Sequence, residues 1–416
     1  MNDARSSAAT ALQAIRESYG IDAEAIVAAH RASAGTARRT PVIRPAGSSP
    51  GLDVLLKAEN LQLTGSYKVR GALNKVRALG RDCPGVVAAS AGNHAQGLAY
   101  AARASGIRCS LYLPTAAPLT KVNAIRALGA EIHQGGATVD DCFALAREAA
   151  QRSGWSLVHP FDDRDIIIGQ GGVAVELLQD VEDLAQVVVP VGGGGLAAGV
   201  AVAIKAAAPH VKVIGVLARA CAPFVQASFP EEQRSDVATA IADGVAVKRP
   251  GEIPGAIVER LLDDLVVVED QQIAHAMVWA MEQAKLVVEG AGAVSIAALL
   301  HDQVACAADG ATVAVVSGGN IDIGLIGAVV RQHENRIGRR LRLGARLQDR
   351  PGSLAELLQT AADAGANLID VHHVRDGLPM EVREVIVELT LETRGERESH
   401  DLRAALKKAG FSTVEV

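Results

Sequence analysis

The chain has 416 residues and a mass of 43.0 kDa, which predicts two or three domains. Hydrophobic residues make up 49% of it and aromatic residues only 3%, so we expect α/β layers with cores of Ala, Val, Leu and Ile, and extensive disorder is excluded. The 41 Lys and Arg residues stand against 47 Asp and Glu residues without a long basic block, which gives no support for nucleic-acid binding.

The N-terminal segment and the cysteines predict a soluble, cytoplasmic protein. The first 19 residues are interrupted by charges and lack the apolar core of a secretory signal. The most apolar long stretch, residues 286–300, contains Glu289 and two glycines and falls short of a membrane span. The cysteines form no CxxC pair and predict buried, reduced thiols without disulfides or a metal site. They are Cys83, Cys109, Cys142, Cys221 and Cys306.

From about residue 50 to residue 325, short apolar runs alternate with longer helical patterns. The runs are mostly rich in β-branched residues and predict strands buried on both faces, at residues 54–56, 86–88, 110–112, 187–189, 213–216 and 313–316. Segments rich in Ala and Leu predict helices between them, at residues 69–79, 95–104 and 196–208. This alternation predicts a parallel, layered α/β body.

A charged, apolar-poor segment at residues 331–340 predicts a link to a separate domain. The residues after it predict the order βαββαβ, an α+β sandwich with helices on one face. Ser353 is expected to cap the first of these helices, and residues 399–409 to form the second. In the strand at 385–391, Val387, Leu389 and Leu391 are expected to share one face, and the last strand is expected at 411–416.

Lys68 lies in the sequence GSYKVRG, residues 65–71, at the start of a predicted helix. A helix N-terminus lowers the pKa of a nearby amine and favours the neutral, nucleophilic form that a Schiff-base lysine needs. Taken alone, the pattern fits a surface lysine better.

Three further motifs follow predicted buried strands. Residues 90–97, SAGNHAQG, form a strand-turn-helix junction suited to a carboxylate, although an ordinary βα turn is an equal interpretation. Residues 192–195 are four glycines before a helix and suit a monophosphate better than a flexible loop. Residues 317–320, SGGN, place a small hydroxyl at a strand end, although a simple turn is a nearly equal interpretation. Together with Lys68 they predict a ligand site at the carboxyl ends of parallel strands.

In this order, the four motifs resemble the threonine/serine dehydratases (ammonia-lyases) of the second fold type of pyridoxal-phosphate enzymes, over about residues 20–325. Residues 347–354 and 365–368 resemble an ACT domain, an amino-acid-sensing module. The resemblance implies a two-lobed catalytic domain over residues 1–335, with a small lobe at about 55–160 inserted in the large lobe. An ACT-like regulatory domain would follow over residues 336–416.

The resemblance also implies pyridoxal 5'-phosphate as cofactor and Lys68 as the catalytic Schiff-base lysine. Tyr67 would lie beside the cofactor ring, Asn93 would contact its phenolic oxygen and Ser317 its pyridine nitrogen. The phosphate would be held by Gly192, Gly193, Gly194, Gly195 and Leu196. The substrate carboxylate would be bound by Ser90, Ala91, Gly92, Asn93 and His94.

The implied reaction is β-elimination from L-threonine to 2-oxobutanoate and ammonia, and from L-serine to pyruvate. Serine racemases are similar but carry Ser where Ala91 stands, so racemase is an alternative, as is hydroxyaspartate dehydratase. A non-catalytic amino-acid sensor is disfavoured by Lys68. No side chain is evident as proton donor to the leaving hydroxide, and the cofactor phosphate is a hypothesis. Glu289 lies in a family-like stretch but equally fits a helix-start carboxylate.

The ACT resemblance implies an amino-acid effector, such as isoleucine or valine, near Asp349, Gly352 and Asn367, and a homo-oligomer, dimer or tetramer. Some relatives bind a divalent cation through acidic residues where this chain has Ala218, Arg219 and Ala220, so no metal is expected. The sequence leaves three questions open. They are the sign of regulation, the choice between a biosynthetic role (isoleucine) and a degradative role, and the preference for threonine over serine.

Overall fold

The computed structural model describes residues 2–47, 52–220, 222, 224–225, 240–374 and 383–414. It forms two compact units, Met1–Asp322 and Ile323–Val416. The expected link at 331–340 is partly helical, because helix α13 (Ile323–Arg336) extends into it and belongs to the second unit. The units therefore divide earlier in the chain than the domain division that we expected after residue 335.

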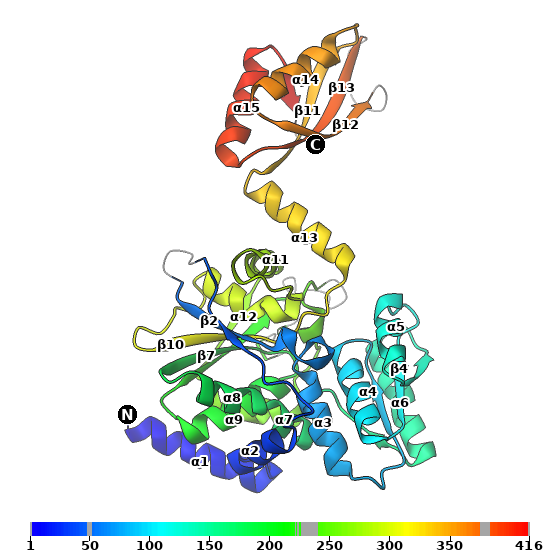
Figure 1. The fold of residues 1–416 in the computed structure, drawn as a ribbon, viewed down its shortest axis with the longest axis vertical. Coiled ribbons are helices and arrows are strands. Elements are labelled where there is room, and N and C mark those ends of the chain that lie inside the picture. Colours follow the sequence, from blue (N-terminus) through cyan, green and yellow to red (C-terminus); the bar gives the residue numbers. More distant parts are fainter. Residues whose placement is uncertain are drawn as a thin grey trace. The chain divides into compact units, whose positions relative to one another are not determined.

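A six-stranded sheet forms the centre of the first unit (Figure 1). Its order is β1-β2-β10-β7-β8-β9, and only β1 runs antiparallel to its neighbour. The strands are β1 (Val42–Ile43), β2 (Val54–Ala58), β7 (Leu184–Pro190), β8 (Lys212–Ala218), β9 (Asp264–Val268) and β10 (Ala311–Val316). The predicted parallel sheet of doubly buried strands is confirmed, while the edge strands β1 and β9 were not predicted.

Helices cover both faces of this sheet (Figure 1). One face carries α11 (Asp270–Trp279) and α12 (Gly290–Leu300). The other face carries α1 (Asn2–Tyr19), α2 (Ala23–Ala32), α7 (Arg164–Gln170), α8 (Gly172–Asp180), α9 (Gly195–Ala207) and α10 (Glu252–Leu261). Helix α9 is almost entirely buried, because its Ala, Val and Gly residues are small enough for close packing against the sheet and the neighbouring helices.

A smaller parallel sheet, β5-β4-β3-β6, lies beside the large one. Its elements are β3 (Val86–Ala89), β4 (Cys109–Leu113), β5 (Glu131–Gln134), β6 (Ser156–Leu157), α3 (Lys68–Leu79), α4 (Asn93–Ser105), α5 (Leu119–Ala127) and α6 (Val139–Ser153). We expected this lobe to begin near residue 55, but β2 pairs with β10 and so belongs to the large sheet. Helix α3 packs on both α4 and α7 and therefore joins the two lobes.

The second unit has the predicted βαββαβ order after α13. Its antiparallel sheet, β12-β13-β11-β14, packs on α14 and α15 (Figure 1). The elements are β11 (Arg340–Gln348), α14 (Ser353–Asp363), β12 (Asn367–Val374), β13 (Glu384–Glu392), α15 (Glu396–Lys408) and β14 (Ser412–Val414). Val387, Leu389 and Leu391 share the buried face as expected.

Three details of this unit differ from expectation. Ser353 is the first residue of α14 instead of its cap, because Gly352 takes the cap position with φ of +94°, a conformation that favours glycine. Helix α15 begins at Glu396, before the expected start at Ser399. The last strand begins at Ser412, one residue later than expected, and residues 415–416 lie outside the described residues.

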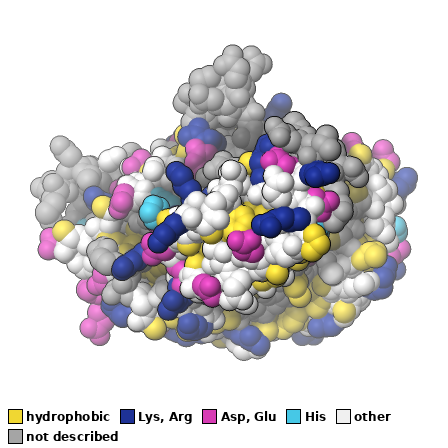
Figure 2. Space-filling view, turned by 90° about the horizontal axis from the view of Figure 1, so that it is seen from above, with side chains coloured by type: hydrophobic (Ala, Val, Ile, Leu, Met, Phe, Trp, Pro, Cys, Tyr) yellow, Lys and Arg dark blue, Asp and Glu magenta, His cyan; other side chains and the backbone are white. Residues whose placement is uncertain are grey.

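No helix in the described ranges is long and apolar enough to cross a membrane. The four described cysteines form no disulfide; Cys109 and Cys142 are buried as expected, but Cys83 and Cys306 are only partly so. Cys221 lies outside the described residues. On the face shown in Figure 2, basic and acidic side chains are interspersed.

Candidate active site

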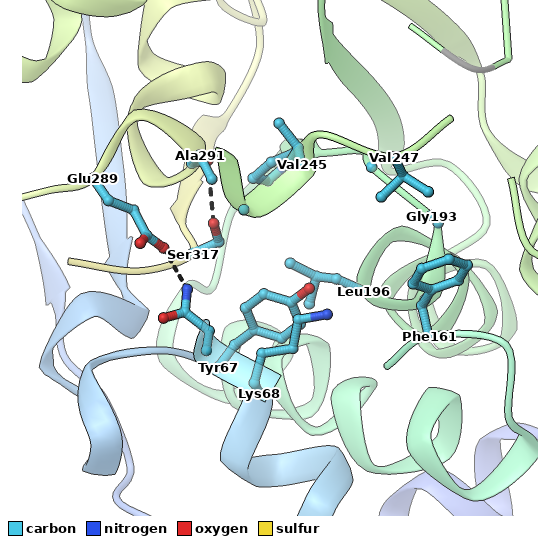
Figure 3. Close-up of a pocket in the computed structure, with 16 residues that line it drawn as sticks. Tyr67, Lys68, Phe161, Gly193, Leu196, Val245, Val247, Glu289, Ala291 and Ser317 are labelled. Carbon is cyan, nitrogen blue, oxygen red and sulfur yellow. Dashed lines mark hydrogen bonds between the residues drawn. The ribbon is translucent and has the colours of Figure 1, made fainter. Parts of the chain in front are cut away.

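One pocket, here called the Lys68 pocket, lies where the carboxyl ends of β7 and β10 meet the starts of α3, α4, α9 and α12 (Figure 3). The empty space between its walls, including the part open to solvent, is about 480 Å³. The pocket brings together all nine residues that were predicted to bind the cofactor. Its lining is Tyr67, Lys68, Asn93, Phe161, Pro190, Gly192, Gly193, Gly194, Gly195, Leu196, Gly244, Val245, Val247, Glu289, Ala291 and Ser317.

Lys68 is the first residue of α3, and its side chain extends into the pocket next to Tyr67 (Figure 3). The amine donates a hydrogen bond of 3.0 Å to the carbonyl oxygen of Pro160 and lies 5.3 Å from the centroid of the Tyr67 ring. Burial lowers the pKa of Lys68 from 10.5 to about 8, against the opposing effect of the Glu289 carboxylate. The neutral, nucleophilic amine is therefore well populated slightly above neutral pH.

The four glycines after β7 form a turn that side chains would fill. A Cβ atom on Gly192 would lie 2.8 Å from the backbone of Val245, and one on Gly193 would lie 2.4 Å from the Phe161 ring. Gly194 has φ of +93°. Among the described residues, no protein acceptor receives the N–H groups of Gly193, Gly194, Gly195 or Leu196. These donors at the N-terminus of α9 fit a phosphate group.

Asn93 is held from two sides at the start of α4. Its amide nitrogen donates to Glu289 Oε1 at 2.6 Å, and its amide oxygen accepts from Asn320 Nδ2 at 2.7 Å. Asn320 also donates to the carbonyl oxygen of Thr64 at 2.7 Å. Burial, with a smaller effect of the Asp243 charge, raises the pKa of Glu289 to about 7. The second N–H of Asn93 is still available to a ligand.

Ser317 follows β10 and is 3% exposed. Its hydroxyl donates to the carbonyl oxygen of Ala291 at 3.2 Å (Figure 3). Its own carbonyl oxygen accepts a hydrogen bond of 3.1 Å from the N–H of Tyr67. The end of β10 therefore holds both the small hydroxyl and the start of α3.

The turn at residues 90–93 is less enclosed than the glycine turn. Ser90 Oγ accepts from the N–H of Gly92 at 3.2 Å, and a Cβ on Gly92 would meet no atom within 4 Å. Of the five residues predicted to bind the substrate carboxylate, only Asn93 lines the pocket. The His94 ring is buried with Nε2 3.2 Å from the carbonyl oxygen of Val158, and burial lowers its pKa to about 3. His94 can therefore offer a ligand only its backbone N–H.

Beyond the predicted residues, the lining includes Phe161, which was missed, and Glu289, which was left ambiguous. Phe161 comes from the segment after β6 and packs on the glycine turn, but it lies in no motif, so nothing in the sequence points to it. Glu289 lines the pocket and also precedes α12, where it forms no side-chain cap. The sequence signal for Glu289 was its place in a family-like stretch, and a helix-start carboxylate was an equal interpretation.

The three predicted effector residues do not lie together. Asp349 and Gly352 follow β11 at the start of α14. Asn367 is paired with Glu392, which pairs in turn with Arg340 at the opposite end of β11. The length of strand β11 therefore separates Asn367 from Asp349 within one chain.

Comparison with known proteins agrees with this geometry. Residues 34–318 match the model of the family described as pyridoxal-phosphate dependent enzyme. An L-threonine ammonia-lyase of Thermotoga maritima is 42% identical over 366 residues, which cover 87% of this chain and 90% of that protein. The structure of maize serine racemase matches with a TM-score of 0.68 and 31% identity, covering 76% of this chain and 99% of that chain.

The structure of the processed form of threonine deaminase isoform 2 from Solanum lycopersicum matches with a TM-score of 0.67 and 32% identity, covering 74% of this chain and 86% of that chain. The family match includes the lysine at the start of α3, the glycine turn and the hydroxyl after β10. The chain belongs to the family of pyridoxal-phosphate-dependent enzymes.

Proposed function

We propose that this protein is an L-threonine ammonia-lyase, which converts L-threonine to 2-oxobutanoate and ammonia and also accepts L-serine, giving pyruvate. The observation that carries this proposal is the buried Lys68 amine, whose lowered pKa makes it a base, in one pocket with a phosphate-sized turn. The 42% identity to an L-threonine ammonia-lyase over most of both chains supports the choice of reaction.

The residues present fit pyridoxal 5'-phosphate. The Lys68 amine can bond to its aldehyde, and the N–H groups of residues 193–196 can hold its phosphate. Asn93 has an N–H for the phenolic oxygen, and Ser317 has a hydroxyl for the ring nitrogen. When bound, the cofactor supplies a conjugated ring that takes up the electron pair left on Cα.

The protein's own residues supply the binding and the proton transfers. The N–H groups of the turn at 90–94 bind the substrate carboxylate and orient Cα. The free Lys68 amine would remove the Cα proton and become an ammonium. That proton is then available to the β-hydroxyl, which leaves as water. The unsaturated product hydrolyses to the 2-oxo acid and ammonia.

Replacement of Lys68 tests the proposal directly. We expect Lys68→Ala to abolish 2-oxobutanoate formation and the visible absorbance of cofactor bound to lysine. Lys75→Ala is the matched control, because Lys75 lies on the same helix but pairs with Asp163 at 2.7 Å outside the pocket. A Lys68→Ala protein that keeps both the absorbance and the activity would overturn the proposal.

Serine racemase is the second candidate, favoured by the match to the maize enzyme. Ala91 argues against it, because a methyl group cannot deliver a proton to the opposite face of Cα. Chiral analysis of serine recovered from a reaction separates the two candidates. A rate comparison on L-threonine, L-serine and 3-hydroxyaspartate tests the hydroxyaspartate alternative, and any turnover excludes a non-catalytic sensor.

For the second unit we propose an ACT-like regulatory domain that binds an amino acid such as isoleucine or valine. If Asp349, Gly352 and Asn367 hold one effector, they must come from two copies of the chain, because one copy separates them. This supports a homo-oligomer. Truncation after Ile337 is expected to remove the response to isoleucine or valine and to keep the chemistry; a truncated protein that still responds would contradict the proposal.

A further inference from the structure

Four charged side chains form a buried cluster behind helix α3, away from the Lys68 pocket. They are Lys57 of β2, Glu59 of the turn after β2, Arg70 of α3 and Glu176 of α8, and each is at most 3% exposed. None of them lines the pocket. The proposed reaction therefore assigns no role to Arg70, although it belongs to the same motif as Lys68.

Arg70 is the centre of this cluster. Its Nε and Nη2 donate to the two carboxylate oxygens of Glu59, both at 2.8 Å. Its Nη1 and Nη2 donate to the two oxygens of Glu176, at 2.7 and 3.0 Å. One planar guanidinium thus binds two carboxylates at once, which fixes its orientation as well as its position.

Lys57 completes the cluster. Its amine donates to Glu176 Oε2 at 2.6 Å and to the carbonyl oxygen of Thr40 at 2.7 Å. The backbone N–H of Thr40 donates to the same Glu176 oxygen at 3.2 Å. The two positive and two negative charges balance, and every carboxylate oxygen has a donor. The cluster thus binds α3 to β2, to α8 and to the segment before β1.

The cluster lies close to Lys68 in sequence and on the other side of the helix. Residues two apart on an α-helix project about 200° from each other, so Arg70 points away from the side on which Lys68 enters the pocket. No side-chain cap holds the start of α3. On the pocket side, the first turn is held by the hydrogen bond from Tyr67 to Ser317.

We propose that Arg70 is a positioning residue, which through Glu59 and Glu176 fixes the rotation and height of the first turn of α3 and so the place of the Lys68 amine. Buried ion clusters are directional and add little net stability compared with apolar packing, which suits a role in orientation. This inference depends on the proposed function only in that Lys68 is the lysine that binds the cofactor.

Two variants of the holoenzyme test this role. Arg70→Lys keeps the charge but loses the planar fork that binds two carboxylates. The pair Arg70→Met with Glu59→Gln removes one charge of each sign, so that Glu59 is not left as an unpaired carboxylate, while Glu176 keeps its hydrogen bond from Lys57 and loses those from Arg70. In both we expect kcat to fall about ten- to hundredfold, while KM for L-threonine stays within about threefold. The visible circular dichroism of cofactor bound to Lys68 should weaken.

The control is Lys205→Met. Lys205 of α9 is 7% exposed and pairs at 2.7 Å with Asp263, whose side chain is 37% exposed, so its loss breaks an ion pair that has one buried partner. We expect it to lower the melting temperature, with kcat within about twofold of wild type and the dichroic band unchanged. If the wild-type holoenzyme itself shows no visible dichroic band, that result contradicts the proposed function instead of this inference.

Two results would overturn the inference. The first is that both Arg70 variants keep kcat and the dichroic band within the range of the Lys205→Met control, whatever their melting temperatures. The second is that neither variant yields folded protein, because Arg70 would then serve the stability of the whole unit instead of the placement of Lys68.

Discussion

Two turns approach the Lys68 pocket, one after β7 of the large sheet and one after β3 of the small sheet. Both follow a parallel strand and precede a helix, and both contain glycine. In the turn after β7, neighbours or backbone conformation exclude side chains at Gly192, Gly193 and Gly194. In the turn after β3, Gly92 has φ of −113° and no atom within 4 Å of where its Cβ would lie.

The same residue type therefore serves two purposes. The turn after β7 is a rigid cradle whose shape is set by Phe161 and Val245, which suits a cofactor phosphate that stays bound. The turn after β3 leaves space in front of its backbone, which suits a substrate that enters and leaves. A glycine motif in a sequence does not distinguish these two cases, because the difference lies in residues distant along the chain.

Among changes in the two turns, the largest effect is expected from Gly193→Ala. The new methyl group would lie about 2.4 Å from the Phe161 ring, so the turn must shift and its N–H groups lose their alignment. Overpacking of this kind costs about 1–3 kcal/mol, which corresponds to about a ten- to hundredfold weaker cofactor affinity. Titration of cofactor-free protein with pyridoxal 5'-phosphate, followed by absorbance, measures the change. An affinity close to that of wild type would mean that the turn is not the phosphate site.

Gly92→Ala is the complementary change and should act on the substrate instead of the cofactor. The backbone conformation of Gly92 is accessible to alanine and no neighbour obstructs the methyl group. We expect unchanged cofactor affinity and a KM for L-threonine raised about tenfold, because one obstructing methyl in a binding site is worth about 1–3 kcal/mol. Steady-state kinetics on L-threonine and L-serine measure it. A weaker cofactor affinity with an unchanged KM would reverse the assignment of the two turns.

The comparison of the two turns also shows which residues of the site could be predicted from the sequence. Lys68, the glycine turn and Ser317 were predictable, because each lies within a few residues of a strand end or helix start and local pattern fixes its place. Phe161 and the hydrogen bonds that join Asn93 to Glu289 and Asn320 were not, because they link segments that are 32 residues apart (Phe161 and Gly193) to 227 residues apart (Asn93 and Asn320). Such contacts depend on how the two lobes pack, which periodicity does not encode.

The fold shows the same division. The strands at 187–189 and 313–316 were recognised because both faces are buried and every residue is apolar. Strand β5 (Glu131–Gln134) is an edge strand with charged and polar residues, so its sequence lacks an apolar run. The domain boundary was expected too late because the charges of α13 are typical of a link as well as of an exposed helix.

The smallest effect on activity is expected from Glu289→Gln. This variant tests the protonation state of the carboxyl group that accepts a hydrogen bond from Asn93, in the turn after β3. Gln keeps the oxygen that accepts from Asn93 but cannot ionise. The pKa of Glu289 is about 7 in the folded protein against an ordinary value of 4.5, so between these values the folded state holds a proton that the unfolded state has lost. Stability of the wild type therefore falls as the pH rises from 4.5 to 7 and then stays level.

The Gln variant does not lose stability in this way. Its free energy of unfolding should therefore exceed that of wild type by an amount that grows between pH 5 and 7, to at most about 3 kcal/mol. Above pH 7 the difference should stay constant. Urea unfolding of cofactor-free protein at pH 5, 6, 7 and 8 measures the difference, with Glu282→Gln as a surface control for the substitution itself. A difference that does not change with pH would mean that Glu289 is ionised throughout. Asn93 would then be held by a carboxylate at every pH, and the turn after β3 would carry a fixed negative charge beside the substrate carboxylate, which would weaken its assignment as the substrate cradle.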